Sequence, residues 1–427
     1  MKKLLVIAEC INKDSTSEGI GTCSFLNALA EGNYQIDCVF FQYVQHELEE
    51  HTHISERVNL IKIRNTWVDH LIQWARPVRN RLNKHLGYDL LRNRRSFRFK
   101  KVLNKLLNDK EYHLIFVRTI ASSLASHKAV LELSKMRDFN WIVNFNDPAP
   151  SSMMPYPYNL KLQSFSRKNR RDEILVRNIV KAASGIASPS LLLTERFLNF
   201  TAINKDPERL FRFPHVYENL QTTAGKSFLN PSKFNLVHAG SLLEERTPRY
   251  LLMAIDELAE EDSLFRDRSK LTFFGSLHQS HQKDFDSFSH REILDLHNNR
   301  IPHQDALNVL RDSDILIILE AISDDSPFMP SKLAEFIGMD KCILALSPPL
   351  SETRRILGSD YEFQTEADNV QQIKELIKYL FKEWENKRSL TLNSPLLQKY
   401  VSPSHVIKEI DRALKIFARD ETILINK

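Results

Sequence analysis

Residues able to bind a nucleotide are grouped in the second half of the chain. The run "MPSKLAEFIGMDKCILAL", from Met329 to Leu346, contains a short helix pattern with Lys332 and Glu335, followed at once by an apolar strand pattern. A carboxylate has paired acceptors and a ribose diol has paired donors, so Glu335 is suited to hold a ribose. Ser331 stands where an N-cap is expected, which would direct Lys332 toward the same ligand. A surface Lys–Glu pair three residues apart has the same spacing, and the residues alone do not separate the two interpretations.

A second polar group follows a strand pattern that ends at Gly240. In "HAGSLLEERTPRYLLMAI" the next helix begins near Pro248, with Arg246 and Arg249 at its start. Ligands bind at the carboxyl ends of strands in open parallel sheets, and a guanidinium there can clamp a diphosphate. The helix dipole disfavours an arginine in the first turn, which favours a functional interpretation of Arg246 over a merely solvated side chain.

In the first half, "STSEGIGTCSF" places Gly19 and Gly21 between the first strand and the first helix. Such a turn lets backbone N–H groups approach a phosphate at a helix N-terminus. The pattern lacks the third glycine of a dinucleotide fingerprint and the lysine of a P-loop, so an ordinary tight turn is an equal alternative. The chain has only ten glycines, and two in one turn favour the phosphate site.

Acidic residues at strand ends are further candidates. Asn146 and Asp147 end the pattern "NWIVNFNDP" and would orient sugar or acceptor hydroxyls, with an Asx turn before Pro148 as the alternative. Asp312 and Asp314 have the DxD spacing of metal-dependent glycosyltransferases. They lie where a helix pattern passes into a strand pattern, where Asp is a usual turn residue, so we expect no metal there.

The elements that must position these residues alternate between strand and helix patterns. Apolar runs of five to seven residues between helices are typical of a parallel sheet covered on both faces, and so of the α/β class. A polar stretch interrupts the alternation and His215 lies at its edge. We therefore expect a Rossmann-like domain at 1–215, a linker at 216–232 and a second Rossmann-like domain at 233–403, with a helix near 404–420 packing back on the first domain.

Composition indicates a soluble globular protein, with 42% hydrophobic and 26% charged residues. No apolar run approaches 18 residues, and the first one reaches Glu9 without a cleavage site, which favours a buried strand over a signal peptide. The four cysteines lack CxxC spacing. We expect reduced thiols in a cytoplasmic protein, with neither a disulfide framework nor a metal knuckle.

The net charge of +5 is unevenly distributed. Between Ile61 and Lys110 there are 14 Lys/Arg and 3 Asp, a sum of +11, which leaves 5 − 11 = −6 for the rest. Aromatic residues among these arginines are typical of a helix at an anionic membrane surface. The alternatives are a solvated charged face over a core stripe and, without a reading motif, nucleic acid. The residues expected at the membrane or acceptor are Trp67, Trp74, Arg76, Arg79, Arg81, Arg94 and Arg95.

Taken together, "GIG", "GSLLEERTP" and "PSKLAEFIGMDKCILAL" resemble GT-B glycosyltransferases of family 4. The last run is similar to the family's P-x-K-h-x-E-h-h-x-x-G-K-P-h-h-A, where h is apolar, and the resemblance extends from residue 3 to about 380. It implies two Rossmann-like domains facing a central cleft, with the acceptor side in the first and the donor side in the second. It also implies a nucleoside-diphosphate sugar donor, retention of configuration, and neither metal nor other cofactor.

The resemblance also implies roles for individual residues. Glu335 would take the ribose, and Arg246 would meet the diphosphate together with the two glycines of "GIG". The expected catalytic residues are Asp147, Arg246 and Lys332. The expected donor site comprises Gly19, Gly21, Gly240, Ser241, Arg246, Asp325, Ser326, Ser331, Lys332 and Glu335.

Two positions depart from the family. A basic residue often follows the glycine that ends the first strand of the second domain, and here it is Ser241. A second Glu often stands eight residues before the ribose-binding one, and here it is Pro327. Either an aspartate of "DDSPFM" or its backbone N–H groups replace that Glu, or the donor sugar differs.

The function that follows is transfer of a sugar to a hydroxyl of a cell-surface glycan (a polysaccharide, lipopolysaccharide or capsule) or of a lipid-linked acceptor. The expected place is the inner face of the cell membrane, where the protein would be peripheral. A nucleotide-sugar 2-epimerase of the same fold and a non-catalytic membrane-surface protein are the alternatives.

Overall fold

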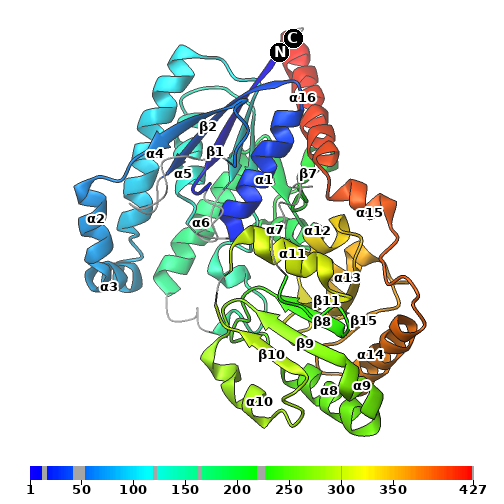
Figure 1. The fold of residues 1–427 in the computed structure, drawn as a ribbon. Coiled ribbons are helices and arrows are strands. Elements are labelled where there is room, and N and C mark those ends of the chain that lie inside the picture. The colour runs from blue at the N-terminus through cyan, green and yellow to red at the C-terminus, as the bar shows by residue number, and fades with distance from the viewer. Residues whose placement is uncertain are drawn as a thin grey trace. The chain divides into compact units, whose positions relative to one another are not determined.

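The structure is a computed structural model that describes residues 1–11, 17–41, 53–118, 123–160, 166–218, 227–299 and 301–425. The chain divides into two compact units (Figure 1). Unit 1 comprises Met1–Met154, Tyr158–Val216 and Ser402–Lys427, and unit 2 comprises Pro155–Pro157 and Tyr217–Val401. Each unit is built on a parallel sheet, as the alternation of patterns predicted.

The sheet of unit 1 has seven parallel strands in the order β3-β2-β1-β4-β5-β6-β7. Its central strands are apolar over most of their length because helices cover both faces. The order runs outward from β1 in two directions, which places a topological switch point between β1 and β4. The strands are β1 (Lys2–Ala8), β2 (Tyr34–Phe41), β3 (Val58–Ile63), β4 (Leu114–Arg118), β5 (Trp141–Asn144), β6 (Gly185–Ser188) and β7 (Leu210–Arg212).

Alternate side chains of β1 enter two different cores, as strand geometry requires. Leu4 and Val6 belong to the core beneath α1 and α16, whereas Leu5 and Ile7 belong to the core beneath α4 to α7. The helices are α1 (Ser17–Glu31), α2 (Trp67–Trp74), α3 (Arg76–Leu86), α4 (Leu90–Asp109), α5 (Ala125–Ser134), α6 (Ser166–Ala182), α7 (Leu191–Thr201) and α16 (Pro403–Ile425).

Helix α16 follows unit 2 in sequence but packs in unit 1 against α1 (Figure 1). Its apolar side, including Ile410, is buried in the first core of unit 1. The Tyr34 hydroxyl donates to Asp411 at 2.7 Å, and Arg412 donates to the carbonyl oxygen of Leu210 at 2.6 Å. The last helix therefore completes the fold of the first unit.

The sheet of unit 2 has six parallel strands in the order β10-β9-β8-β11-β13-β15, with its switch point between β8 and β11. A separate two-stranded ladder joins β12 (Asp325–Ser326) to β14 (Leu350–Ser351). The strands of the sheet are β8 (Phe234–Ala239), β9 (Ser269–Phe274), β10 (Leu294–His297), β11 (Ile315–Leu319), β13 (Cys342–Leu346) and β15 (Gln364–Thr365). The helices are α8 (Arg249–Glu261), α9 (Ser263–Arg268), α10 (Gln282–Ser287), α11 (His303–Asp312), α12 (Ser331–Gly338), α13 (Glu352–Leu357), α14 (Val370–Glu385) and α15 (Pro395–Tyr400).

The structure has elements that the sequence patterns did not predict. Strands β3, β7, β10 and β15 lie toward the edges of the sheets, where strands are short or carry charges and lack a continuous apolar run. The expected tryptophan-containing helix is broken at Ala75 into α2 and α3. Among the described helices, none combines the length and the apolar character needed to cross a membrane.

Removing a buried side chain from α16 tests its place in unit 1. Ile410→Ala should lower the free energy of unfolding by about 2–5 kcal/mol, because it leaves a cavity in a fully buried core. Denaturant unfolding followed by circular dichroism measures the change. Lys408→Ala, at an exposed position of the same helix, should change it by less than about 0.5 kcal/mol. Equal effects of both substitutions would contradict this packing.

Candidate functional site

The carboxyl edge of the unit 2 sheet is organised around Glu320, the residue after β11. The carboxyl group is buried and accepts hydrogen bonds from the hydroxyls of Ser326 and Thr353, the latter at 2.6 Å. Burial raises the pKa of Glu320, while the two hydroxyls and the nearby guanidiniums of Arg246 and Arg354 act in the opposite direction. Glu320 therefore ties β12 and α13 to the strand ends.

Arg246 lies in the loop between β8 and α8, close enough to act on both Glu320 and His238. Burial lowers the pKa of His238 to about 4, and the positive charge of Arg246 lowers it further. His238 Nδ1 lies 3.3 Å from the carbonyl oxygen of Ile317, and its Nε2 has no partner among the described residues. At neutral pH the imidazole is therefore uncharged, and Arg246 and Arg354 supply positive charge at this edge.

The backbone that follows β8 has open space beside it at Gly240. Gly240 has a φ of +117°, and a Cβ built on it would meet nothing within 4 Å. Gly275 on the neighbouring loop has a φ of +130°, and its Cβ would lie 2.3 Å from the carbonyl oxygen of Gly240. Ser241 is exposed. Glycine is thus needed at both positions, and a ligand has room beside Gly240.

Helix α12 differs in one respect from the expectation. The helix begins at Ser331 and its N-cap is Pro330, which makes no side-chain cap bond, so the predicted capping by Ser331 is wrong. Lys332 Nζ lies 2.9 Å from Glu335 Oε2, and both side chains are mostly buried. The ion pair of the alternative interpretation is therefore present, and ribose binding by Glu335 stays a prediction.

The end of α12 fits against Tyr217. A Cβ on Gly338 would lie 2.1 Å from the tyrosine ring, so this position admits only glycine. Burial raises the pKa of Tyr217, Arg311 lowers it and Glu335 raises it. The phenol, the guanidinium and the ribose-binding candidate Glu335 thus lie close together on one side of α12.

The predicted donor residues of unit 2 fall into two groups. Arg246 and Ser326 meet at Glu320, whereas Lys332 pairs with Glu335. The DxD residue Asp314 is structural, since its carboxylate accepts the backbone N–H of Asn235 at 2.7 Å. Among the described residues, the structure holds no His/Cys/Asp/Glu group suited to a metal ion.

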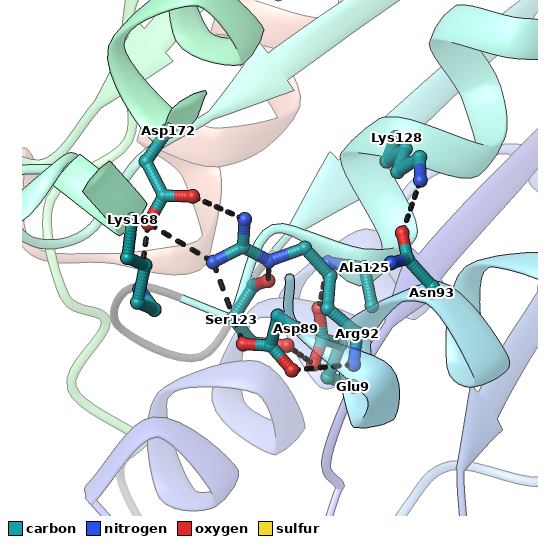
Figure 2. Close-up of polar contacts among 9 residues, drawn as sticks. All are labelled: Glu9, Asp89, Arg92, Asn93, Ser123, Ala125, Lys128, Lys168 and Asp172. Carbon is teal, nitrogen blue, oxygen red and sulfur yellow. Dashed lines mark hydrogen bonds and ion pairs between the residues drawn. The ribbon is translucent and has the colours of Figure 1, made fainter. Parts of the chain in front are cut away.

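In unit 1, the end of β1 is held by a buried polar network (Figure 2). Glu9 accepts the backbone N–H groups of Ala125 and Ser126 at 3.0 and 3.2 Å. Arg92 of α4 makes two bonds to Asp172 of α6 and one to the carbonyl oxygen of Ser123 at 2.7 Å. This network joins α4, α5 and α6 at the carboxyl edge and is a scaffold for the neighbouring site.

That neighbouring site is formed by the first turn of α1 and the ends of β4 and β5. The Glu18 carboxylate accepts from Asn146 Nδ2, from Arg118 at 3.4 Å and from the Thr22 hydroxyl at 3.4 Å. Burial raises the pKa of Glu18 to about 7, with Arg118 and Asn146 acting to lower it and Asp147 to raise it.

The two glycines of "GIG" lie elsewhere than expected. Helix α1 begins at Ser17, so Gly19 and Gly21 lie within its first two turns, and the predicted turn between strand and helix is wrong at these residues. A Cβ on Gly21 would lie 3.3 Å from His215 Nδ1 and 3.7 Å from Arg118. Gly21 therefore allows the histidine and the arginine to approach the helix.

In the basic segment, helix α2 exposes apolar residues and buries a charged one. On α2, Trp67 is 76% exposed and Trp74 is 82% exposed, whereas Asp69 is buried. Asp69 accepts from Arg94 at 3.2 Å and from Arg98 at 2.5 Å. The polar side of α2 thus faces the protein and its tryptophans face solvent.

Of the arginines expected at that surface, Arg76 and Arg81 are exposed and Arg79 is half-buried. Arg95 does not belong to the surface, and the side chain of Arg94 is 31% exposed. Arg94 is used in the ion pair with Asp69, and Arg95 is buried with its guanidinium 5.8 Å from the centre of the Phe41 ring.

The sequence analysis did not identify four residues at the carboxyl edges of the two sheets: Glu18, Arg118, His238 and Glu320. Arg118 and Glu320 end the runs "LIFVR" and "ILIILE", and a charge that closes a buried strand is the signal that marks them. Glu18 and His238 carry no comparable signal.

No protein-family model matches the sequence, and no curated protein does so either. Solved structures match over almost the whole chain. A trehalose-6-phosphate synthase from Burkholderia multivorans has a TM-score of 0.65 at 12% identity, covering 99% of this chain and 100% of its own. An E. coli trehalose-6-phosphate synthase bound with UDP-2-fluoro glucose has a TM-score of 0.59 at 10% identity, covering 98% and 96%. One from Burkholderia xenovorans in complex with glucose-6-phosphate has 0.56 at 10%, covering 99% and 100%.

The fold is GT-B. At these identities the likeness establishes the fold alone. Membership of family 4 within that fold stays a prediction.

The ionisation of Glu18 should be visible in stability. A pKa raised from 4.5 to about 7 means that the folded state holds a proton that the unfolded state releases, so stability falls as pH rises through this range, by about 3 kcal/mol. Glu18→Gln has no carboxyl group to ionise, so its folding stability should not fall with rising pH in this way. Its midpoint of thermal unfolding, relative to the unsubstituted protein, should therefore be several degrees higher at pH 8 than at pH 4.

Glu31→Gln, at an exposed position of the same helix, is the control and should show no such trend. A difference for Glu18→Gln that does not depend on pH would contradict the raised pKa.

Proposed function

We propose that this protein is a glycosyltransferase that uses a nucleoside-diphosphate sugar. The observation that carries the proposal is the charge of Arg246 near Glu320 and His238, in the loop that follows Gly240 at the carboxyl edge of the unit 2 sheet. The fold supports it, since a synthase with this fold is bound with UDP-2-fluoro glucose. A fixed positive charge beside exposed backbone suits a diphosphate.

The donor would be held by unit 2. Glu335 accepts the ribose hydroxyls and exchanges its bond to Lys332 for them, which leaves the ammonium free to meet the donor. Arg246 meets the diphosphate, where negative charge grows as the bond from the anomeric carbon to the β-phosphate oxygen breaks. Gly240, Ser241, Asp325 and Ser331 complete this side, together with the hydroxyl of Ser326, which Glu320 orients.

The acceptor would be held by unit 1. Asp147 orients the attacking hydroxyl, whose oxygen forms the new bond to the anomeric carbon while its proton passes to the departing phosphate. This transfer retains configuration and assigns no role to a metal. Gly19 and Gly21, in the first turns of α1, would meet the diphosphate.

The acceptor would be a glycan or a lipid-linked sugar at the inner face of the cell membrane, with the protein bound peripherally. Helix α2 supports this, because Trp67, Leu71 and Trp74 are exposed while Asp69 is not. Arg76 and Arg81 follow the tryptophans on α3 and are exposed. Tryptophans beside arginines suit the headgroup region of an anionic bilayer.

Nucleotide binding tests the donor site. Calorimetry against UDP, GDP, CMP, ADP and TDP should show one preferred nucleotide. Glu335→Ala should weaken its binding by about 10- to 100-fold, the worth of hydrogen bonds to a charged acceptor. The control is Glu362→Ala, which removes an exposed glutamate of the same unit and should leave both stability and nucleotide binding unchanged. Glu352 is buried and its removal would disturb the fold, so Glu352→Ala is not used.

A protein that binds none of these nucleotides would be neither a transferase nor an epimerase. Conversion of a bound nucleotide sugar to its epimer without acceptor would favour the epimerase.

Vesicle binding tests the membrane surface. Cosedimentation with vesicles that contain anionic lipid should be strong at low salt. The double variant Trp67→Ala/Trp74→Ala should weaken vesicle binding at least tenfold, because it lacks the two indoles that would enter the headgroup region of the bilayer. Leu396→Ala in unit 2, at a residue that is also 82% exposed, is the control. Equal binding by all three proteins would remove the membrane from the proposal.

A further inference from the structure

Arg118 is a buried cation with incomplete pairing. Its side chain is 5% exposed, and its contact with Glu18 is long, at 3.4 Å. Its Nε has no hydrogen-bond partner among the described residues. The guanidinium packs over the Phe25 ring at 4.9 Å, which fixes its position without satisfying its donors. A buried guanidinium in this state retains the capacity to bind an anion.

The surroundings of Arg118 suit an anion. The guanidinium lies at the first turns of α1, a 15-residue helix whose N-terminus carries partial positive charge. His215 approaches the same place, since a Cβ on Gly21 would come within 3.3 Å of its Nδ1 and 3.7 Å of Arg118. The absence of a side chain at Gly21 leaves this position to the arginine and the histidine.

We propose that Arg118, His215 and the first turns of α1 form a phosphate-binding site in which the Glu18 carboxylate competes with the ligand for Arg118. The ligand class is a phosphate monoester or a diphosphate. Either an acceptor or a donor would supply it, and the experiment below separates these two sources.

Binding at this site is coupled to a proton. An anion next to Arg118 displaces the Glu18 carboxylate from it and disfavours the ionised form, so Glu18 takes up a proton as the ligand binds. The pKa of Glu18, about 7, makes this exchange possible near neutral pH. Among the described residues, the charged or titratable groups around Arg118 and Glu18 include Asp147 after β5, His215 after β7 and the Cys38 thiol of β2.

The test is calorimetry with the full chain and sulfate, a dianion that does not itself titrate near neutral pH. Affinity should fall about tenfold between pH 6 and pH 8, because a pKa of about 7 leaves the competing carboxylate mostly protonated at the first pH and mostly ionised at the second. At pH 7.5 the binding heat should depend on the buffer, with net proton uptake.

Glu18→Gln should show a much smaller fall in sulfate affinity over this range than the unsubstituted protein, and most of its proton uptake should be lost. Arg118→Met should abolish binding, and Arg118→Lys should restore part of it. Glu31→Gln should behave as the unsubstituted protein. Because Arg118 is buried, its variants count only where thermal unfolding shows that they fold, and Glu18→Gln remains decisive where they do not.

The source of the phosphate is then tested by competition. Displacement of sulfate by glucose 6-phosphate but not by pyrophosphate would assign an acceptor monoester, and the reverse would assign a diphosphate. Sulfate binding should persist in Glu335→Ala, so failure of the nucleotide site and failure of this one are distinguishable. No sulfate binding, or an affinity that ignores pH or the Glu18 substitution, would overturn the proposal.

Discussion

A carboxyl group buried where a parallel strand ends is the constraint on which each candidate site depends. Glu9 follows β1 in unit 1, and Glu320 follows β11 in unit 2. A buried carboxylate without donors costs several kcal/mol, so the chain must bring N–H and O–H groups to it. Glu9 accepts a hydrogen bond from a backbone N–H group at the N-terminus of α5, and Glu320 accepts hydrogen bonds from hydroxyls of β12 and α13. The loops that surround a ligand are thereby fixed before any ligand arrives.

Glu18 obeys the same constraint less completely. Its donors are an amide, a hydroxyl and a distant guanidinium, and it lies beside the negative charge of Asp147. The difference from Glu9 is physical: two backbone N–H groups at a helix N-terminus stabilise a carboxylate, whereas one side-chain amide does so weakly. A group balanced in this way responds to a nearby charge, and a fully paired one does not. A buried carboxyl group at the carboxyl edge of the unit 1 sheet thus has two uses. Glu9 holds the scaffold in Figure 2, and Glu18 beside it can respond to a ligand's charge.

The sequence predicted the α/β class and the parallel sheets because buried parallel strands are continuous apolar runs, and "KLLVIA" or "ILIIL" has no other good explanation. It did not predict β10, "LDLH", whose polar residues are tolerated at an edge. It placed Gly19 and Gly21 in a turn because two glycines between a strand and a helix are typical of a phosphate-binding loop, yet α1 starts before them. Besides the local Thr22, the partners of Glu18 are residues 118 and 146, about 100 positions or more away, and no local pattern predicts such a contact.

The same limit applies to α2, where the pattern predicted an apolar stripe but not the side on which it lies. Asp69 decides the orientation: its carboxylate is shared by Arg94 and Arg98 of α4, and these bonds hold the polar side of the helix inward. Turning the helix over would bury two indoles, a gain of a few kcal/mol by area, but it would break this ion-pair cluster and leave two arginines of α4 without their shared carboxylate. The tryptophans of α2 are thus exposed because the ion pairs of Asp69 with Arg94 and Arg98 hold the opposite side of the helix against unit 1. Since a large exposed apolar surface is rarely kept without a use, the energy not gained in folding is available for binding.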